Sequence, residues 1–310
     1  MRDQFRNFLL LGWKDSSKIY ADANPLLHLP GEGKLWESWK TAFELADNKA
    51  SDYGKKFRNT YTYLYFFSIV AVVFGVLNIG LNLEGPLKII FPIGELLSIG
   101  TIAWFYWSEK KHDWHKEWIQ YRFHTEYLRC LPLICLESPD KVDYKSSGAI
   151  GTNERKKLHE EIFQSSPSIS SCMNYAVALA KNQRKYFHKA SAREKFIEKR
   201  VEKISYIFFG ITFIAVVLEF FVHTGWIMVI TTLLPAAVAS LHGAMGSEES
   251  GRNEGRYKMM EEGTKDWLND YEHCSEDNIK AKGMHELANL LLSEVDGWHK
   301  LMKDLEIHLG

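Results

Sequence analysis

Two groups of residues could carry chemistry, and the first holds the patterns that would indicate an enzyme or a metal site. Residues 31–34 (GEGK) and 148–152 (GAIGT) are similar to phosphate-binding loops, but neither completes G-x-x-x-x-G-K-[ST]. His112 and His115 could share one helix face, yet no His-Glu-x-x-His pattern accompanies them. No Ser-His-Asp or Cys-His set is evident either. We therefore expect no catalytic residue, no cofactor and no metal, and a membrane enzyme is the weakest function class.

The second group consists of polar residues inside long apolar segments. Glu95 lies near the middle of one such segment, with Ser98 three positions later, whereas Glu219 lies near the end of another. A carboxylate at the centre of a membrane span costs roughly 2.5–3.5 kcal/mol on insertion scales, while one near the end can extend to the membrane surface. Glu95 therefore either lines a water-filled path or is protonated or hydrogen-bonded to Ser98, Asn78 or Asn82.

Each apolar segment carries its polar residues along one side. In the first, Ser68, Gly75, Asn78 and Asn82 fall within about 80° of arc on a helix. The other stripes are Glu95 with Ser98, then Ser205, Thr212 and Glu219, then Thr231, Pro235 and His242. Small and hydroxyl residues are common where membrane helices pack, so packing is the alternative to a pore lining. The pore-lining candidates are Glu95, Glu219, Asn78, Asn82, Ser98 and Thr212.

The segments that position these residues are long enough to cross a membrane. No charged residue occurs from Asn59 to Leu83, and Glu219 is the one formal charge from Ile204 to Leu241. A helix of 18 or more apolar residues spans the roughly 30 Å hydrocarbon core of a bilayer. A long buried helix of a soluble protein is the disfavoured alternative. The four predicted spans are Tyr61–Leu83, Lys88–Trp107, Ser205–Val222 and Trp226–Leu241.

Short links pair the spans into two predicted hairpins. Residues 84–87 join the first two spans and residues 223–225 join the last two. The predicted fold is all-α, with four transmembrane helices as two hairpins and long juxtamembrane helices that form a cytoplasmic helical domain. The expected parts are a cytoplasmic segment 1–60, hairpin 61–107, cytoplasmic segment 108–204, hairpin 205–245 and C-terminal helices 246–310.

The charges predict the orientation. Residues 1–58 hold 10 Lys and Arg, and residues 109–203 and the tail after 246 are also rich in Lys and Arg, whereas the outer links contain at most Lys88. The positive-inside rule then places both termini and the central segment in the cytoplasm, with the protein in the bacterial inner membrane. A net charge of -1 speaks against nucleic-acid binding. The four cysteines form no CxxC pair and predict free thiols in a reducing compartment.

The polar segments predict helices with an aromatic stripe. The helix of the second span is expected to continue without a breaker, because Trp107, Trp114, Trp118 and Tyr121 follow at intervals of seven, four and three. A stripe this aromatic is expected to pack against another helix. The residues expected to assemble the cytoplasmic domain are Trp114, Trp118, Arg122 and Glu126.

The sequence predicts that one architectural unit, a two-span hairpin followed by a long charged helix, occurs twice in the chain. Arg122 lies 15 residues beyond Trp107, and Arg256 lies 15 beyond Leu241. A two-span hairpin followed by Trp118-x3-Arg122-x3-Glu126-x-Leu128-Arg129 resembles the SLATT domains of bacterial nucleotide-signalling and antiphage systems. Residues 236–263 are similar in their small-residue exit from the span and their charged helix, so the resemblance covers about 55–135 and 195–270. It implies a pore-forming or membrane-disrupting effector triggered by a nucleotide-sensing domain, which here would belong to a partner.

Two function classes follow. The first is an oligomeric membrane pore or channel-like effector in bacterial defence or stress signalling, gated by its cytoplasmic helices or by a nucleotide-sensing or defence-system partner protein. Four helices pack around their side chains and leave no lumen, so a pore requires a homo-oligomer. The second is a non-conducting membrane anchor or scaffold whose cytoplasmic helical domain binds a partner protein.

Overall fold

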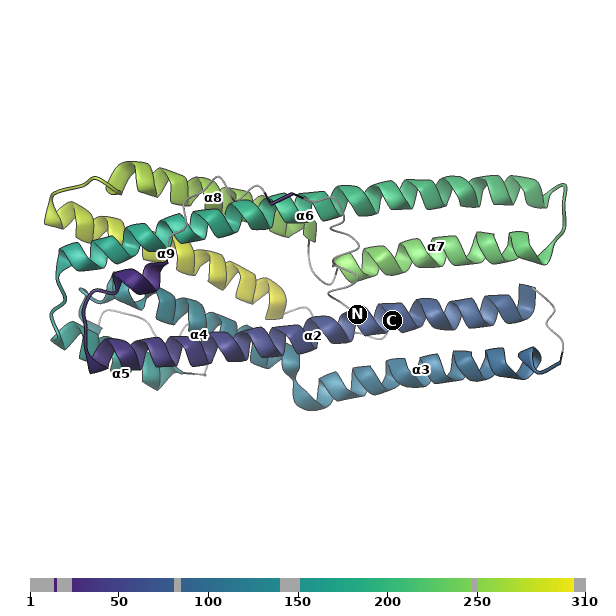
Figure 1. The fold of residues 1–310 in the computed structure, drawn as a ribbon, viewed down its shortest axis with the longest axis horizontal. Coiled ribbons are helices and arrows are strands. Elements are labelled where there is room, and N and C mark those ends of the chain that lie inside the picture. The colour runs from purple at the N-terminus through teal and green to yellow at the C-terminus, as the bar shows by residue number, and fades with distance from the viewer. Residues whose placement is uncertain (1–13, 16–23, 81–84, 140–150, 247–249, 304–310) are drawn as a thin grey trace. The chain divides into compact units, whose positions relative to one another are not determined.

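The computed structural model describes residues 14–15, 24–80, 85–139, 151–246 and 250–303, and these form an all-α protein (Figure 1). A short 3₁₀ turn, Pro25–His28, precedes the α-helices. The described part contains eight α-helices and no strand, which confirms the predicted fold class. They are α2 Lys34–Gly80, α3 Leu87–His112, α4 Trp114–Ile134, α5 Thr152–Gln164, α6 Ile169–Glu219, α7 Gly225–Gly246, α8 Ser250–Tyr271 and α9 Asp277–Lys303.

Four of the described helices, α2, α3, α6 and α7, are long and apolar enough to cross a membrane. This confirms the coarse prediction of four helices that are able to span a membrane. With 47 and 51 residues, α2 and α6 are about 70 and 77 Å long at 1.5 Å per residue, more than twice the roughly 30 Å apolar core. Each therefore joins an apolar segment and a charged segment in one unbroken helix.

The predicted continuity between the second span and the following helix is wrong. Asp113 adopts the left-handed conformation (φ 46°, ψ 41°), ending α3 at His112 before α4 begins at Trp114. Aspartate tolerates this conformation better than most residues, and the basic residues in the last turn of α3 favour a helix C-terminus. Trp107 and Trp114 consequently belong to different helices.

The chain forms two compact units, with α2 and α6 contributing residues to both. Apart from the N-terminal residues, the first contains residues 55–113 and 193–252 and is called the apolar unit below. The second contains residues 14–54, 114–192 and 253–310 and is called the polar unit.

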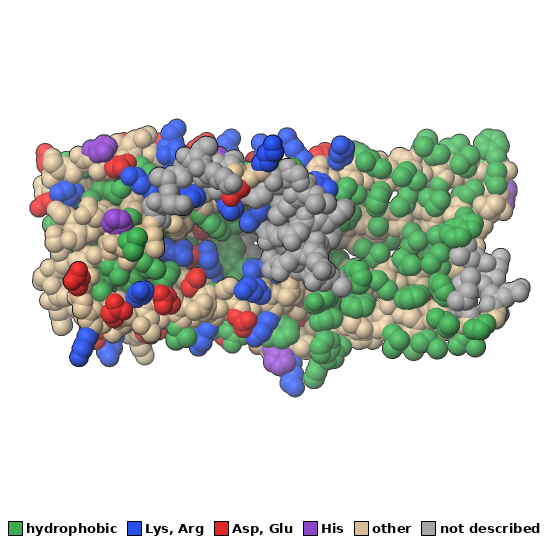
Figure 2. Space-filling model, in the orientation of Figure 1, with side chains coloured by type: hydrophobic (Ala, Val, Ile, Leu, Met, Phe, Trp, Pro, Cys, Tyr) green, Lys and Arg blue, Asp and Glu red, His purple; other side chains and the backbone are tan. Residues whose placement is uncertain are grey.

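In the apolar unit, the helices lie side by side in the order α3, α2, α7, α6 (Figure 1). Stacked rings of Tyr63 and Phe105, with centroids 4.8 Å apart, join α2 to α3. Ser205 Oγ and His242 Nε2, 3.0 Å apart, join α6 to α7. Away from these contacts, large apolar side chains such as Phe213 (71% exposed) cover the surface, as the green right half of Figure 2 shows. Lipid is the solvent such a surface requires.

Two glycines, at the end of α2 and the start of α7, allow a close helix approach in this unit. A Cβ atom on Gly225 would collide with the carbonyl oxygen of Gly80. A Cβ on Gly80 would lie 2.8 Å from Val229 Cγ2. Small residues that let backbones approach are a usual device where membrane helices pack.

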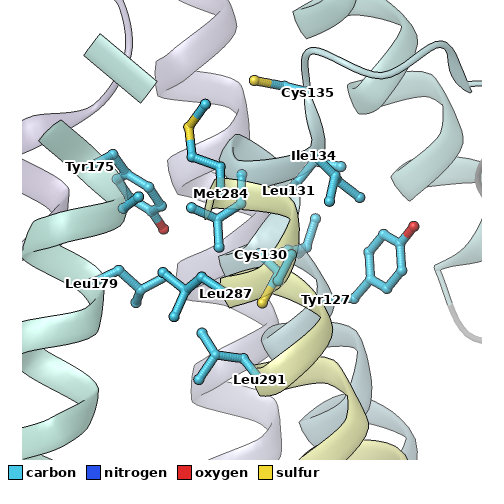
Figure 3. Close-up of a cluster of buried hydrophobic side chains, with 14 of the residues drawn as sticks. Tyr127, Cys130, Leu131, Ile134, Cys135, Tyr175, Leu179, Met284, Leu287 and Leu291 are labelled. Atoms are coloured by element: carbon cyan, nitrogen blue, oxygen red, sulfur yellow. The ribbon is translucent and has the colours of Figure 1, made fainter. Parts of the chain in front are cut away.

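The polar unit has an ordinary hydrophobic core. Buried side chains of α4, α6 and α9 meet in it, among them Leu131, Leu179 and Leu287 (Figure 3). Trp39 of α2 is fully buried in the same core and donates its indole N–H to the Leu128 carbonyl at 3.0 Å. Burial of this apolar surface holds α2, α4, α6 and α9 together, and the indole hydrogen bond positions α2 against α4.

We predict that Gly225→Ala lowers the thermal unfolding midpoint in detergent, because the added methyl group must separate α2 from α7 at a cost of about 1–3 kcal/mol. Gly100→Ala is the matched control. Nothing lies within 4 Å of a Cβ at Gly100 on α3, so this change should leave the midpoint unchanged or raise it. Equal midpoints for the two variants would contradict the close approach.

Candidate functional site

The candidate site in the apolar unit centres on Glu95 of α3. Its half-buried side chain lies against Gly75 of α2, where a Cβ atom would be 3.2 Å from Glu95 Oε1 and 3.4 Å from Oε2. Gly75 belongs to the polar stripe of the first span. Because glycine has no side chain, the Glu95 carboxylate lies against the backbone of α2 at this position. Within the described part of the chain, the Glu95 carboxylate makes no hydrogen bond and no ion pair. An unpaired carboxylate is what a hydrated path would accommodate.

The hydroxyl candidates have partners in their own helices. Ser98 is buried and donates to the Gly94 carbonyl at 2.8 Å. Thr212 is half-buried and donates to the Phe208 carbonyl at 2.8 Å. Hydroxyl groups bonded to the carbonyl four residues earlier need no other partner, so these two residues suit helix packing as well as a pore lining.

The remaining pore-lining candidates are dispersed. Asn78 is half-buried on α2, whereas Glu219 is exposed at the last position of α6. Asn82 lies outside the described residues. The structure thus brings Glu95 to the stripe of α2 at Gly75. The contact between Ser205 and His242 joins the stripes of α6 and α7, and sequence reasoning had not paired these two residues.

In the polar unit, Arg122 and Glu126 lie in a network of charged side chains. Arg122 Nη2 is 2.6 Å from Glu126 Oε1, and Arg129 Nη1 is 2.5 Å from Oε2 of the same carboxylate. Burial alone would raise the pKa of Glu126, but Arg122 and Arg129 outweigh it and hold that pKa below its usual value. A second pair, Arg256 Nη2 with Glu294 Oε1 at 2.7 Å, connects α8 to α9.

The two tryptophans expected to assemble this unit lie on α4. The Trp118 ring packs edge-to-face against Trp298 of α9, with centroids 5.1 Å apart. Trp114 is half-buried at the first residue of α4. The contact between the Trp118 and Trp298 rings joins α4 to α9.

Sequence reasoning missed a buried cluster between α4 and α5. Arg155 is fully buried, and its guanidinium lies over the Tyr127 ring at 5.0 Å and near His124 Nδ1 at 3.5 Å. The other ring nitrogen of His124, Nε2, is 3.2 Å from the Glu154 carboxylate. Burial lowers the pKa of His124, and Arg155 lowers it further. A neutral His124 can donate from Nε2 to Glu154 while Nδ1 faces Arg155.

Stability should depend on pH through this cluster. Because the pKa of His124 is lowered in the fold, the unfolded chain binds its proton more readily. The stabilisation is therefore complete above the ordinary histidine pKa of about 6.5 and is lost as pH falls below it, by at most about 1.4 kcal/mol per pH unit. Burial also lowers the pKa of His159, so this residue contributes in the same direction.

We predict that His124→Gln reduces the loss of stability between pH 8 and pH 5.5, measured as the thermal midpoint of the full chain in detergent. His159 should sustain part of the loss. His273→Gln is the control, because His273 is exposed and its removal should leave the pH profile unchanged. A profile for His124→Gln that matches the wild type would show that His124 protonates without cost to the fold.

The histidine pattern gains no further metal ligands in the part of the chain that the structure describes. Among the described residues, no group of three or more His, Cys, Asp and Glu side chains is placed to hold a metal ion. His112 Nδ1 lies 2.8 Å from the Ser108 carbonyl of its own helix. Residues 148–150 of the second glycine-containing sequence lie outside the described residues.

No family model, no curated protein and no solved structure matches this chain. The resemblance to SLATT domains therefore stays a prediction, carried by the residues that suggested it.

Proposed function

We propose that this protein is an oligomeric membrane pore or channel-like effector. The observation that carries the proposal is the Glu95 carboxylate, half-buried in the middle of an apolar helix, against the glycine surface of α2 and without an ion-pair partner among the described residues. Placing a carboxylate in a dry apolar environment has a high free-energy cost, and contact with water lowers that cost. Carboxylates placed along a path favour cations.

The path in this proposal lies between copies of the chain. The four apolar segments of one copy lie in a row and contact one another through aromatic, glycine and small polar side chains. Such packing fills the space between them. A lumen therefore requires several copies around one axis, so the proposal predicts a homo-oligomer in a lipid membrane.

The two longest helices supply a means of gating. Each of α2 and α6 continues without a break from an apolar segment into residues of the polar unit. A change in the packing of the polar unit can therefore displace a spanning segment, because a helix transmits displacement along its axis. The trigger is a ligand of the polar unit or a partner protein, and the resemblance to SLATT domains suggests a role in bacterial defence or stress signalling.

The proposal includes the predicted orientation, with two hairpins in the inner membrane and both termini in the cytoplasm. In a chain with Cys274 replaced by Ser, a cysteine at Thr224 or Lys88 should react with a membrane-impermeant thiol reagent on intact spheroplasts. A cysteine at Lys157, which is 77% exposed on α5, should react only after lysis. The three remaining native cysteines are buried. Labelling of Lys157→Cys in intact spheroplasts would overturn this orientation.

We predict that Glu95→Gln preserves the fold and the oligomer in liposomes but lowers cation preference by roughly tenfold, because a fixed charge raises the local cation concentration by about that factor or more. Glu198→Gln is the control, because Glu198 is an exposed carboxylate of α6 outside the apolar segment and its neutralisation should leave conduction unchanged. Ion preference that survives Glu95→Lys would remove Glu95 from the pore.

A non-conducting anchor is the second candidate. It is favoured by the hydroxyl groups of Ser98 and Thr212, which are bonded within their own helices and therefore need no water-filled path. Mass photometry of the detergent-purified chain separates the two, since a monomer is compatible with an anchor and incompatible with a pore made between copies.

A further inference from the structure

Among the described residues, one charged network of the polar unit holds more cations than anions. Arg122 and Arg129 share the single carboxylate of Glu126, and Arg256 pairs with Glu294. Three guanidinium groups therefore face two carboxylates. All five side chains are at least partly withdrawn from water, which makes an unbalanced positive charge more costly than it would be on an open surface.

Two of these arginines have unused hydrogen-bond donors. A guanidinium carries five N–H groups in a planar fork. Within the described part of the chain, Glu126 is the one ion-pair partner of Arg122, and 35% of the Arg122 side chain is exposed. Arg256 Nη1 is buried and has no hydrogen-bond partner among the described residues, while Nη2 bonds to Glu294. One arginine is thus reachable from solvent, and the other has a buried donor to satisfy.

The two arginines belong to one cluster. The Trp118 and Trp298 rings, 5.1 Å apart, lie one helical turn from Arg122 and from Glu294, and Glu294 is the partner of Arg256. Arg122 accordingly interacts electrostatically with Glu294, as well as with Tyr186 and Tyr257. The rings of Tyr186 and Tyr257 are themselves 6.1 Å apart, so α6 and α8 border the cluster. Figure 2 shows a hollow in this unit with Lys and Arg side chains at its edge and Asp and Glu side chains near them.

We propose that Arg122 and Arg256 bind a phosphate group, supplied either by a soluble phosphate compound or by a phospholipid headgroup. A phosphate presents several acceptor oxygens to the planar fork of each arginine and balances the surplus positive charge. Binding would connect α4 to α8, the helices that follow the first and the second pair of spans. The site does not depend on whether the protein conducts.

The test uses the full chain in phosphatidylcholine nanodiscs, with inorganic phosphate as the probe and chloride added to keep ionic strength constant. We expect a saturable rise in the thermal unfolding midpoint. Arg122→Gln and Arg256→Gln should each weaken the apparent affinity by about tenfold or more, the usual effect of losing a charge-assisted contact. Lys181→Gln is the matched control, because it removes one charge from a separate ion pair with Glu272 and should keep the rise.

A second nanodisc series identifies the source of the phosphate. If the occupant is a headgroup, phosphatidic acid in the nanodiscs should raise the midpoint and abolish the response to inorganic phosphate. If it is soluble, the response should be the same in both nanodiscs. No rise in either series, or a rise that persists in the Arg122→Gln/Arg256→Gln double variant, overturns the site. Should Arg256→Gln fail to fold, Arg122→Gln decides, because Glu126 keeps Arg129 as its partner.

Discussion

The absence of water around the apolar segments is the constraint on which the rest of this structure depends. A backbone surrounded by lipid must pair all its polar groups internally, and a helix is the way in which a single segment achieves this. The exposed phenylalanines and isoleucines of α3 and α6 are stable only in such surroundings. Lipid gives no hydrophobic drive for helices to associate, so they associate through close backbone approach, as at Gly80 and Gly225, and through polar contacts such as that of Ser205 with His242. Glu95 stands apart because its carboxylate has no hydrogen-bond donor and no ion-pair partner among the described residues.

In the polar unit the apolar side chains are buried in a core, because removing them from water is favourable. This core is built from α2, α4, α5, α6, α8 and α9, and the fully buried Trp39 contacts Leu128 and Tyr175 in it. Charged residues at the edge of this core keep partners, and Arg155 stays buried because aromatic faces and polar side chains surround its guanidinium. Both α2 and α6 contribute residues to the apolar unit and to the polar unit. A change in the packing of either unit therefore affects the same two helices.

The two halves of the chain repeat in architecture but differ in how they balance charge. Arg122 finds its carboxylate four residues later on its own helix, at Glu126. The residue four positions after Arg256 is Met260, which is buried in the core and cannot serve as an anion. Glu294 of α9 supplies the carboxylate instead. The second half therefore depends on the last helix for a contact that the first half makes locally, and this difference brings both arginines to one cluster.

The sequence by itself determined the four apolar helices and the all-α class. The length of an apolar segment and its lack of charged residues are local properties, and they suffice to indicate a helix that can span a membrane. It also located Glu95 as the anomalous charge, since a carboxylate inside such a run is visible without a fold. It missed the break at Asp113, where one residue in a left-handed conformation separates α3 from α4. It also missed α5, whose sequence is mostly polar and buries only a few side chains. Only the tertiary structure paired Arg256 with Glu294 and Arg155 with His124. Those partners lie 38 and 31 residues apart, and contacts at such separations are chosen by helix packing, which no local pattern of residues encodes.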